Sequence, residues 1–335
     1  MHQMIDKQKE EEFYAKDFNF SYSSINKLLF SPSIFYKEYI LEDREIRTDK
    51  HLVEGKLVHC LLLEPEEFKN KFALVPGKTP SDNIRKVMNS MIDFTHEQEL
   101  KDVHDHVILN ALKKMNLYQS LKTDESRVAK VKVDDYDPYW KFLFNKSKDV
   151  IDQDAYNRCQ KQVEIIRANK DVMELFGNGK VNNGTDFELD DEERYIEKYL
   201  QCDLVNNSFG LHGYIDFYKV NHEEKAVTIC DIKTTAKTIA EFEDSVEFYK
   251  YYLQAAIYIK LVYANLDEKI RDVYKFLFKF VVIDKYNQVY VFDVLDNTMR
   301  AWAFSLKDAL DRAEYHYKER DYSLPYDFAT QKIRL

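Results

Sequence analysis

The pattern of hydrophobic and polar positions divides this chain into a helical first part and a strand-rich later part. Ser23 and Ser24 are expected to cap a short helix, and a second one is expected after Pro32. Apolar residues then recur at helical spacing from Lys50 to Leu63. Residues 72–75 follow as a short predicted strand, so strands first enter after a mainly helical opening.

Alternating apolar and polar residues become frequent after residue 190, where polar turn residues separate the predicted strands. The predicted elements of this part are strands at 194–204, 209–220 and 226–234, a helix at 246–264, strands at 273–283 and 288–294, and a closing helix at 297–317. Strands that alternate with long helices indicate an α/β fold, with a mixed central β-sheet flanked by helices.

The same pattern suggests a single domain over residues 1–335, built from three parts. Residues 20–78 form an N-terminal helical part, and residues 151–335 form the α/β core. Between them, residues 79–150 are predicted to be a mainly helical insertion whose role the sequence does not reveal.

Composition narrows the class of protein. The formal net charge of −10 excludes a histone-like protein that binds nucleic acid with its whole surface, although one basic channel remains compatible with it. The four cysteines lie far apart without a C-x-x-C pair, which disfavours zinc and disulfide frameworks. No apolar run approaches the roughly 20 residues that span a bilayer, so we expect a cytoplasmic protein without membrane contact.

Three acidic residues on consecutive predicted strands carry the clearest chemical signal. If the first hairpin turns at 206–207 and the second between 223 and 224, Glu197 lies opposite Asp216, and Asp216 lies opposite Asp231. Facing Cβ atoms are about 4.5–5.5 Å apart, so the three carboxylates would form a row across the sheet. Lys233 is two residues beyond Asp231 and shares its face.

A row of like charges is unfavourable unless a cation is bound to it. Mg²⁺ and Mn²⁺ prefer carboxylate and carbonyl oxygens, and the backbone carbonyl of Ile232 lies between Asp231 and Lys233. Lys233 would orient an attacking water or offset charge that develops at a phosphate. The alternative is a set of ordinary surface acids on exposed strands, and a β-bulge would break the predicted register.

Residues outside the strands add to this candidate site. Gln254 and Tyr258 are four residues apart, hence on one face of the helix after the sheet, where they could reach a phosphate or hold Lys233 in place. His59, four residues after Gly55, could supply a nitrogen ligand that favours Mn²⁺. Each also has a structural explanation, as part of an interfacial helix stripe or as a hydrogen-bonded histidine of a packed helix.

Together, these motifs resemble those of a known nuclease family. The order G-x-x-x-H, strand Glu, G-x-x-D, D-x-K-T-T and Q-x-x-x-Y is similar to that of RecB-like and RecE-like PDDEXK nucleases. The local sequences of these motifs are most similar to those of the RecE-like (exonuclease VIII-type) group of phages and prophages, which also has D-x-K in place of E-x-K. The similar segments are Ser21–Ser33, Gly55–Phe68, Asp231–Ala236 and Tyr251–Tyr258, within a resemblance that covers roughly 20–78 and 150–295.

The resemblance implies a role for each matching residue. His59, Asp216, Asp231 and the Ile232 carbonyl would bind one or two Mg²⁺ or Mn²⁺ ions, and Lys233 would be the catalytic lysine. The strand acid Glu197 and the helix pair Gln254 and Tyr258 match the remaining catalytic positions. Relatives with an iron–sulfur cluster carry three cysteines after this helix, whereas here no cysteine follows Cys230, so we expect no cluster.

The resemblance also implies an activity. A RecE-like enzyme would digest linear double-stranded DNA from its ends, in the 5′→3′ direction, and leave 3′ single strands for a single-strand annealing recombinase. It would work as a homo-oligomeric ring in the cytoplasm of a bacterial or phage-infected cell. Two alternatives stay open: an endonuclease or a single-strand or flap-specific PDDEXK nuclease, and a catalytically dead DNA-binding module. The presence of every expected site residue weighs against the last.

Overall fold

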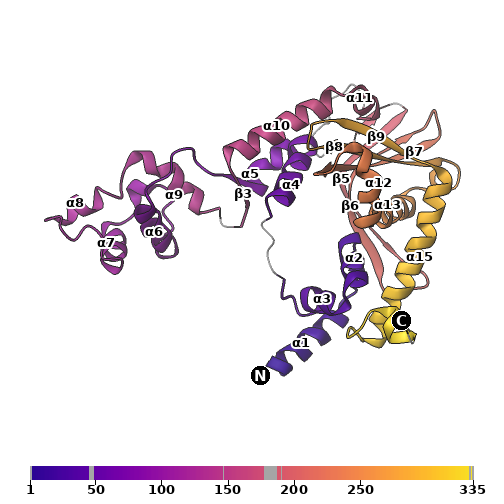
Figure 1. Ribbon diagram of the computed structural model, residues 1–335, viewed down its shortest axis with the longest axis horizontal. Helices are drawn as coiled ribbons and strands as arrows, with labels where there is room; N and C mark the ends of the chain where they lie inside the picture. The colour runs from indigo at the N-terminus through magenta and orange to yellow at the C-terminus, as the bar shows by residue number, and fades with distance from the viewer. Residues whose placement is uncertain are drawn as a thin grey trace. The chain divides into compact units, whose positions relative to one another are not determined.

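The computed structural model describes residues 2–44, 49–145, 147–176, 187–189, 191–331 and 333. The chain divides into two compact units, and each is described by itself (Figure 1). The first unit comprises Met1–Arg47 and Glu164–Leu335, and the second comprises Thr48–Val163. Helix α10 (Gln153–Ala168) begins in the second unit and ends in the first.

A β-sheet forms the centre of the first unit. Within the described residues it has seven strands, in the order β4-β5-β6-β7-β8-β9, with β1 paired to β6. The strands are β1 (Asn19–Phe20), β4 (Phe187–Leu189), β5 (Glu192–Asp203), β6 (Gly210–Asn221), β7 (Ala226–Thr235), β8 (Lys275–Asp284) and β9 (Val289–Val294). The five strands predicted from residue 194 onward are therefore confirmed, to within two residues at each end.

The sheet is mixed, as the sequence predicts. Strands β5, β6 and β7 form an antiparallel meander through short polar connections, and β8 pairs antiparallel with β9. Between β7 and β8 the pairing is parallel, which requires a long crossover connection. That connection contains α12 (Phe242–Phe248), α13 (Tyr251–Asn265) and α14 (Glu268–Arg271). The fold is thus α/β, with a mixed central sheet flanked by helices.

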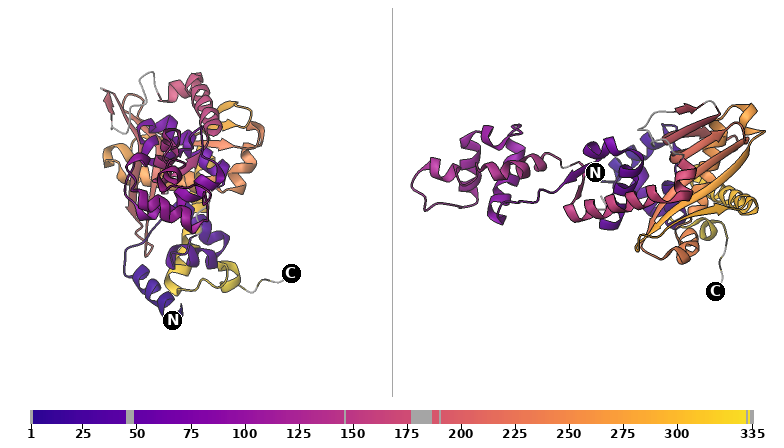
Figure 2. Two further views of the ribbon diagram at one scale, coloured as in Figure 1. Left: turned by 90° about the vertical axis from the view of Figure 1, so that its left-hand side faces the viewer. Right: turned by 90° about the horizontal axis from the view of Figure 1, so that it is seen from above.

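Helices cover both faces of this sheet. On one face α13 packs against β5, β6, β7 and β8, and α15 packs in turn against α13 and α2 (Figure 2). On the other, Phe176 of α11 contacts Phe217 of β6, with ring centroids 4.5 Å apart. The remaining helices of this unit are α1 (His2–Tyr14), α2 (Tyr22–Phe30), α3 (Pro32–Phe35), α11 (Lys170–Phe176), α15 (Asp296–Glu319) and α16 (Tyr326–Thr330).

The single long helix predicted at 246–264 is wrong, because the chain bends between α12 and α13. Lys250 has φ 56° and ψ 42°, the left-handed region, which costs a non-glycine residue about 1–2 kcal/mol. The hydrophobic period runs on through this point, so it gives no sign of the break. The predicted caps also differ, since Ser21 caps α2, where its side chain accepts a hydrogen bond from the Ser24 amide.

The second unit is mainly helical. Its elements are α4 (Lys50–Leu63), α5 (Phe68–Lys71), β2 (Phe72–Leu74), α6 (Asp82–Met91), α7 (Asp105–Lys114), α8 (Asp124–Val128), α9 (Asp137–Leu143) and β3 (Asp149–Ile151). Helix α4 has the predicted bounds, and β2 pairs in parallel with β3. Residues between 84 and 143 share a hydrophobic core of their own around the fully buried Trp140.

Helix length and polarity bear on membrane contact. Over the described parts of the chain, no helix combines the length and the apolar character that crossing a bilayer requires.

Candidate active site

Glu197 and Asp216 lie at the same level of the sheet, on neighbouring strands. The cross-strand pairs on either side of them are Ile196 with Phe217 and Lys198 with Ile215. These pairs have the register that the sequence predicts for the first hairpin. A carboxylate oxygen of Glu197 and one of Asp216 lie within 4.8 Å of each other, so both side chains point into one place.

The regular alternation of the two strands breaks at this level. Glu197 has φ 47°, a left-handed conformation in the middle of β5. On β6, Ile215 and Tyr218 both belong to the same hydrophobic core, although residues three apart lie on opposite faces of a regular strand. Local strain of this kind is concentrated at functional sites, where the surrounding structure holds it in place.

Strand β7 brings Asp231 and Lys233 to this level. The pairing of β6 with β7 ends at Phe217 and Cys230, one step before Asp216 and Asp231, in the predicted register. Beyond that step, the backbone amide of Ile232 donates a hydrogen bond of 2.8 Å to Asp216 Oδ2. Lys233 Nζ lies 2.5 Å from Asp231 Oδ2. Both aspartates are buried, with exposed fractions of 6% for Asp216 and 0% for Asp231.

Helix α13 holds the lysine from the other side. Lys233 Nζ donates a hydrogen bond of 3.0 Å to Gln254 Oε1, and Gln254 Nε2 donates one of 2.8 Å to the hydroxyl of Tyr258. Gln254 is therefore in direct contact with Lys233, one of the two positions predicted for its polar end. Gly213 allows this approach, since a Cβ there would meet Leu261 Cδ1 at 3.3 Å and Tyr258 Cε1 at 3.6 Å.

Burial and charge act together on the ionisation of these groups. Burial raises the pKa of Asp216, and the Lys233 ammonium and the Ile232 amide offset only part of that rise. For Lys233, burial acts to lower the pKa, but the Asp231 and Asp216 carboxylates outweigh it and raise the pKa. Lys233 is thus held as a cation, suited to donating hydrogen bonds rather than to accepting a proton.

Tyr251 belongs to the site although the sequence assigns it only to an interfacial stripe. The Lys233 ammonium lies 4.7 Å from the centroid of the Tyr251 ring, in a cation–π contact. Tyr251 precedes Gln254 by three residues, hence shares its face of α13. Helical spacing from Gln254 was the signal that could have identified it.

His59 lies in the second unit, on α4, where the predicted helix places it one turn after Gly55. Its role as a ligand is inferred from the order of the motifs. The Ile232 backbone lies between the two functional side chains of β7, as predicted, and its amide is the group already bound to Asp216.

The residues of the first unit suit a small divalent cation. The carboxylates of Glu197 and Asp216 converge, and Asp231 stands one strand further on with its side chain buried, so a doubly charged ion would relieve the repulsion among these acids. All the donors they offer are oxygens, the type that Mg²⁺ and Mn²⁺ select. The donor set therefore fits a metal-dependent reaction at a phosphate, with one lysine beside the ion-binding acids.

Comparison with known proteins gives a family and a solved structure of similar fold. No curated protein matches the chain. A solved structure from Eubacterium rectale, described as a "Putative exonuclease", is similar with a TM-score of 0.46 and 10% sequence identity. That alignment covers 99% of this chain and 92% of the other.

The family match extends over most of the chain rather than over single motifs. The model of the PD-(D/E)XK nuclease superfamily matches residues 19–321, a range that includes all the strands of the central sheet and α13. The acids of β5, β6 and β7, the lysine of β7 and the glutamine of α13 all lie within it. This chain belongs to the PD-(D/E)XK nuclease superfamily.

Proposed function

We propose that this protein is a metal-dependent exonuclease that degrades linear double-stranded DNA. The observation that carries the proposal is Lys233, whose side chain is only 13% exposed and contacts Asp231 and Gln254, on the strand next to Asp216. A largely enclosed lysine beside two buried aspartates suits hydrolysis of a phosphodiester better than it suits a structural role.

The chain's own residues divide the work. Asp216, Asp231 and the Ile232 carbonyl would hold Mg²⁺ or Mn²⁺, and His59 would add a nitrogen ligand. When bound, such an ion supplies an activated water and neutralises charge on the scissile phosphate. Glu197 completes the row of acids. The protonated Lys233 orients the attacking water and offsets charge on the phosphate oxygens, while Gln254 and Tyr258 keep its ammonium in place.

The finer assignments rest on the resemblance to RecE-like enzymes. They are 5′→3′ polarity, production of 3′ single strands for recombination, a ring-shaped homo-oligomer and a single-strand annealing recombinase as partner. A DNA substrate of this kind would place the protein in the cytoplasm of a bacterial or phage-infected cell. We also propose that the whole chain is one nuclease domain in which residues 79–150 are an insertion.

The test uses one linear duplex labelled at either its 5′ or its 3′ end, and a covalently closed circle of the same sequence. With Mg²⁺ or Mn²⁺ we expect progressive loss of the linear duplex, with the 5′ label released first, and an intact circle. Excess EDTA should abolish the reaction, and added metal should restore it. Cleavage that persists after exhaustive removal of metal would contradict the mechanism.

Other results would identify the alternatives. Nicking or cutting of the closed circle would mean an endonuclease, and attack confined to single strands or flaps would mean a structure-specific nuclease. DNA binding without cleavage under any metal would leave a DNA-binding module with an inactive site.

A further inference from the structure

Two large aromatic side chains are exposed at the bend between α12 and α13. Phe248 is 77% exposed and Tyr249 is 48% exposed. Their rings form an edge-to-face pair with centroids 4.9 Å apart. Exposure alone does not mark a binding surface, since Phe304 is equally exposed, so the contacts of this pair decide what it can do.

The pair is continuous with the candidate active site. Tyr249 stacks on Tyr251, with ring centroids 5.4 Å apart and an interplanar angle of 24°. Tyr251 in turn lies under the Lys233 ammonium, 4.7 Å from it. Three aromatic rings thus lead in an unbroken series of contacts from the solvent to the lysine that would act on the phosphate.

The bend is held rigidly rather than left as a loose loop. The backbone carbonyl of Tyr249 accepts a hydrogen bond of 2.5 Å from the Tyr22 hydroxyl and one of 3.3 Å from Asn26 Nδ2, both on α2. The next residue, Lys250, is in the left-handed conformation. Because the surrounding structure fixes a strained backbone here, the two exposed rings are presented in a defined position.

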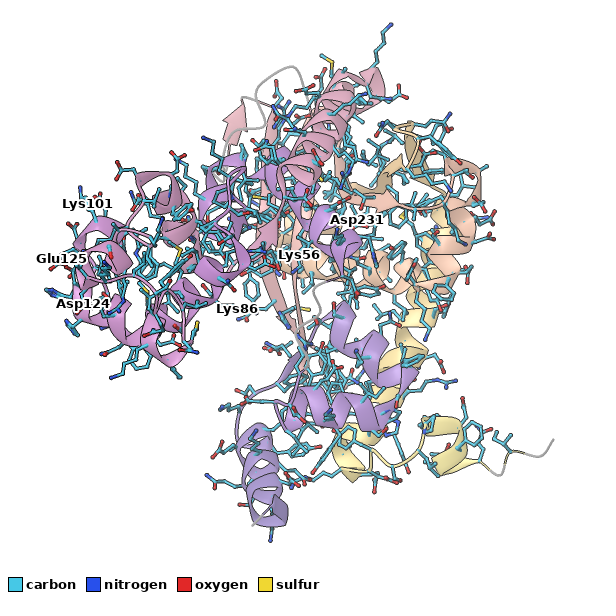
Figure 3. The ribbon with its side chains drawn as sticks, turned by 60° about the vertical axis from the view of Figure 1, so that its left-hand side comes forward. Lys56, Lys86, Lys101, Asp124, Glu125 and Asp231 are labelled. Carbon is cyan, nitrogen blue, oxygen red and sulfur yellow. The ribbon has the colours of Figure 1, made fainter. Side chains whose placement is uncertain are left out.

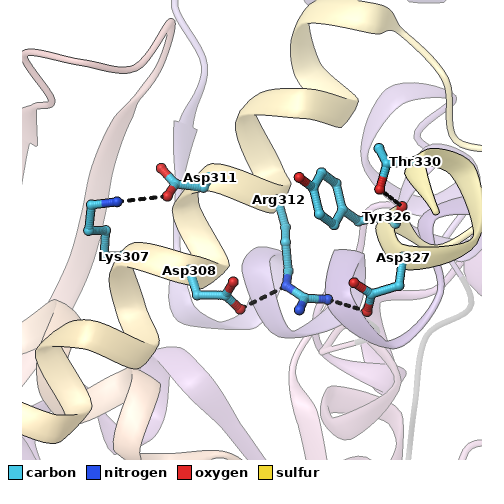
Figure 4. Close-up of polar contacts among 7 residues, drawn as sticks. All are labelled: Lys307, Asp308, Asp311, Arg312, Tyr326, Asp327 and Thr330. Carbon is cyan, nitrogen blue, oxygen red and sulfur yellow. Dashed lines mark hydrogen bonds and ion pairs between the residues drawn. The ribbon is translucent and has the colours of Figure 1, made fainter.

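The residue that follows the two rings in sequence is a cation, Lys250. Among the described residues, Lys250 is in no ion pair, and both burial and the nearby Arg312 lower its pKa. Arg312 itself is engaged: it donates to Asp308 at 2.7 Å and to Asp327 at 2.6 Å, with Tyr326 against its guanidinium (Figure 4). The positive charge of Lys250 would favour a polyanion such as DNA near the bend.

We propose that Phe248 and Tyr249 form a stacking subsite for an unpaired base next to the scissile phosphate. This inference rests on the proposed nuclease function and adds to it how the strand end is gripped. Stacking on aromatic rings accepts every base, which suits an enzyme that must move along DNA of any sequence. It would also hold the terminal base out of its pair.

The test compares Phe248→Ala, Tyr249→Ala and Tyr249→Phe with wild type, and Phe304→Ala is the matched control. Phe304 is 76% exposed on α15 and belongs to no part of the site. A duplex with 2-aminopurine as its terminal base reports stacking through quenched fluorescence, and titration gives the dissociation constant. The background variant Lys233→Met prevents cleavage during these titrations.

We expect the two alanine variants to bind the duplex end about tenfold more weakly and to lose quenching, since one base–aromatic stack accounts for an affinity change of this order. Tyr249→Phe should keep both, and Phe304→Ala should match wild type. In the cleaving enzyme the KM for DNA should rise more than kcat falls.

Equal binding and quenching by wild type and both alanine variants would overturn the stacking subsite while leaving the nuclease intact. A wild-type protein that neither binds nor cuts DNA would overturn the proposed function and the subsite together.

Discussion

The two units bury different kinds of side chain. In the first unit, the buried set includes Asp216, Asp231, Gln254, Asp284 and His316. Among the described residues of the second unit, 49–145 and 147–163, no charged or amide side chain is buried. The core there consists of apolar side chains around Trp140. Figure 3 shows the same contrast: Asp231 lies inside its unit, whereas Lys101, Asp124 and Glu125 project from the surface of theirs.

This difference in buried side chains suggests that the first unit was selected for a reaction and the second for stability. Burying a carboxylate costs free energy unless a partner compensates it, and an apolar core of the same volume would be at least as stable. Three backbone amides, those of Ile239, Tyr286 and Gln288, compensate Asp284. The first unit also keeps Asp216 and Asp231 buried at that cost, which points to selection for a reaction. The second unit has no such cost among its described residues, and its composition is that of a region selected for stability.

The sharpest test of this contrast is replacement of the site residues. Asp231→Asn and Lys233→Met should each lower the cleavage rate at least about 10²–10³-fold, because each removes a preorganised charge at the reaction centre. Asp231→Asn should leave the melting temperature close to wild type because it removes a buried charge, whereas Lys233→Met leaves the buried Asp231 carboxylate without its cation and should lower it. Cleavage of linear duplex and thermal melting by circular dichroism measure the two effects. Near wild-type cleavage by either variant would mean that the site is misplaced.

The second unit should respond in the opposite way. Leu112, buried in the core of the 84–143 region, is replaced by Ala, which should lower the free energy of unfolding of that region by about 2–5 kcal/mol. Denaturation in urea measures this change, and Lys101→Ala at an exposed position is the control. A Leu112→Ala protein as stable as the control would show that the apolar cluster contributes nothing to stability.

His59 tests whether the division between the units is strict. If it is a ligand, His59→Ala should raise the metal concentration needed for half-maximal cleavage about tenfold or more, and excess Mn²⁺ should restore part of the activity. Metal titrations of wild type and variant, with melting curves in EDTA, give both readouts. A lowered melting temperature with an unchanged metal midpoint would leave His59 a structural residue of α4.

The smallest effect concerns His316, a buried polar residue of the first unit outside the site. Burial lowers its pKa, although Nδ1 lies 2.5 Å from the Asp321 carbonyl, whose attraction offsets part of the shift. The unfolded chain therefore binds a proton more readily below about pH 6.5, and stability should fall as the pH falls through that range. His316→Asn keeps a donor but cannot titrate. Its loss of melting temperature between pH 7.5 and 5.5 should be smaller than that of wild type; equal losses would exclude this contribution.

Much of the sheet could be predicted because its information is local. The connections of β5, β6 and β7 are short, so turn position alone sets which residues face one another. That is why Glu197, Asp216 and Asp231 were predicted at one level, and the observed pairs have this register. Helical spacing likewise predicted that Gln254 reaches Lys233, a contact that the structure contains.

The features that the sequence did not reveal depend on distant partners. The bend at Lys250 is stabilised by Tyr22 and Asn26, more than 220 residues earlier in the chain. No local pattern shows that bond, so the helix was predicted to continue. Glu197 adopts a left-handed backbone inside a strand, which its sequence does not indicate. Residue propensities could not have predicted this conformation, because they disfavour a positive φ for glutamate.

The distribution of tryptophan gives the molecule a built-in pair of optical probes. The chain has two tryptophans. Trp140 is fully buried in the second unit, and its indole donates a hydrogen bond to the Glu97 carbonyl. Trp302 belongs to α15 of the first unit, 6.3 Å from the Phe280 ring. Replacing either one by Phe leaves a single emitter, so the unfolding of each unit can be followed by its own fluorescence in the intact chain, without any added label.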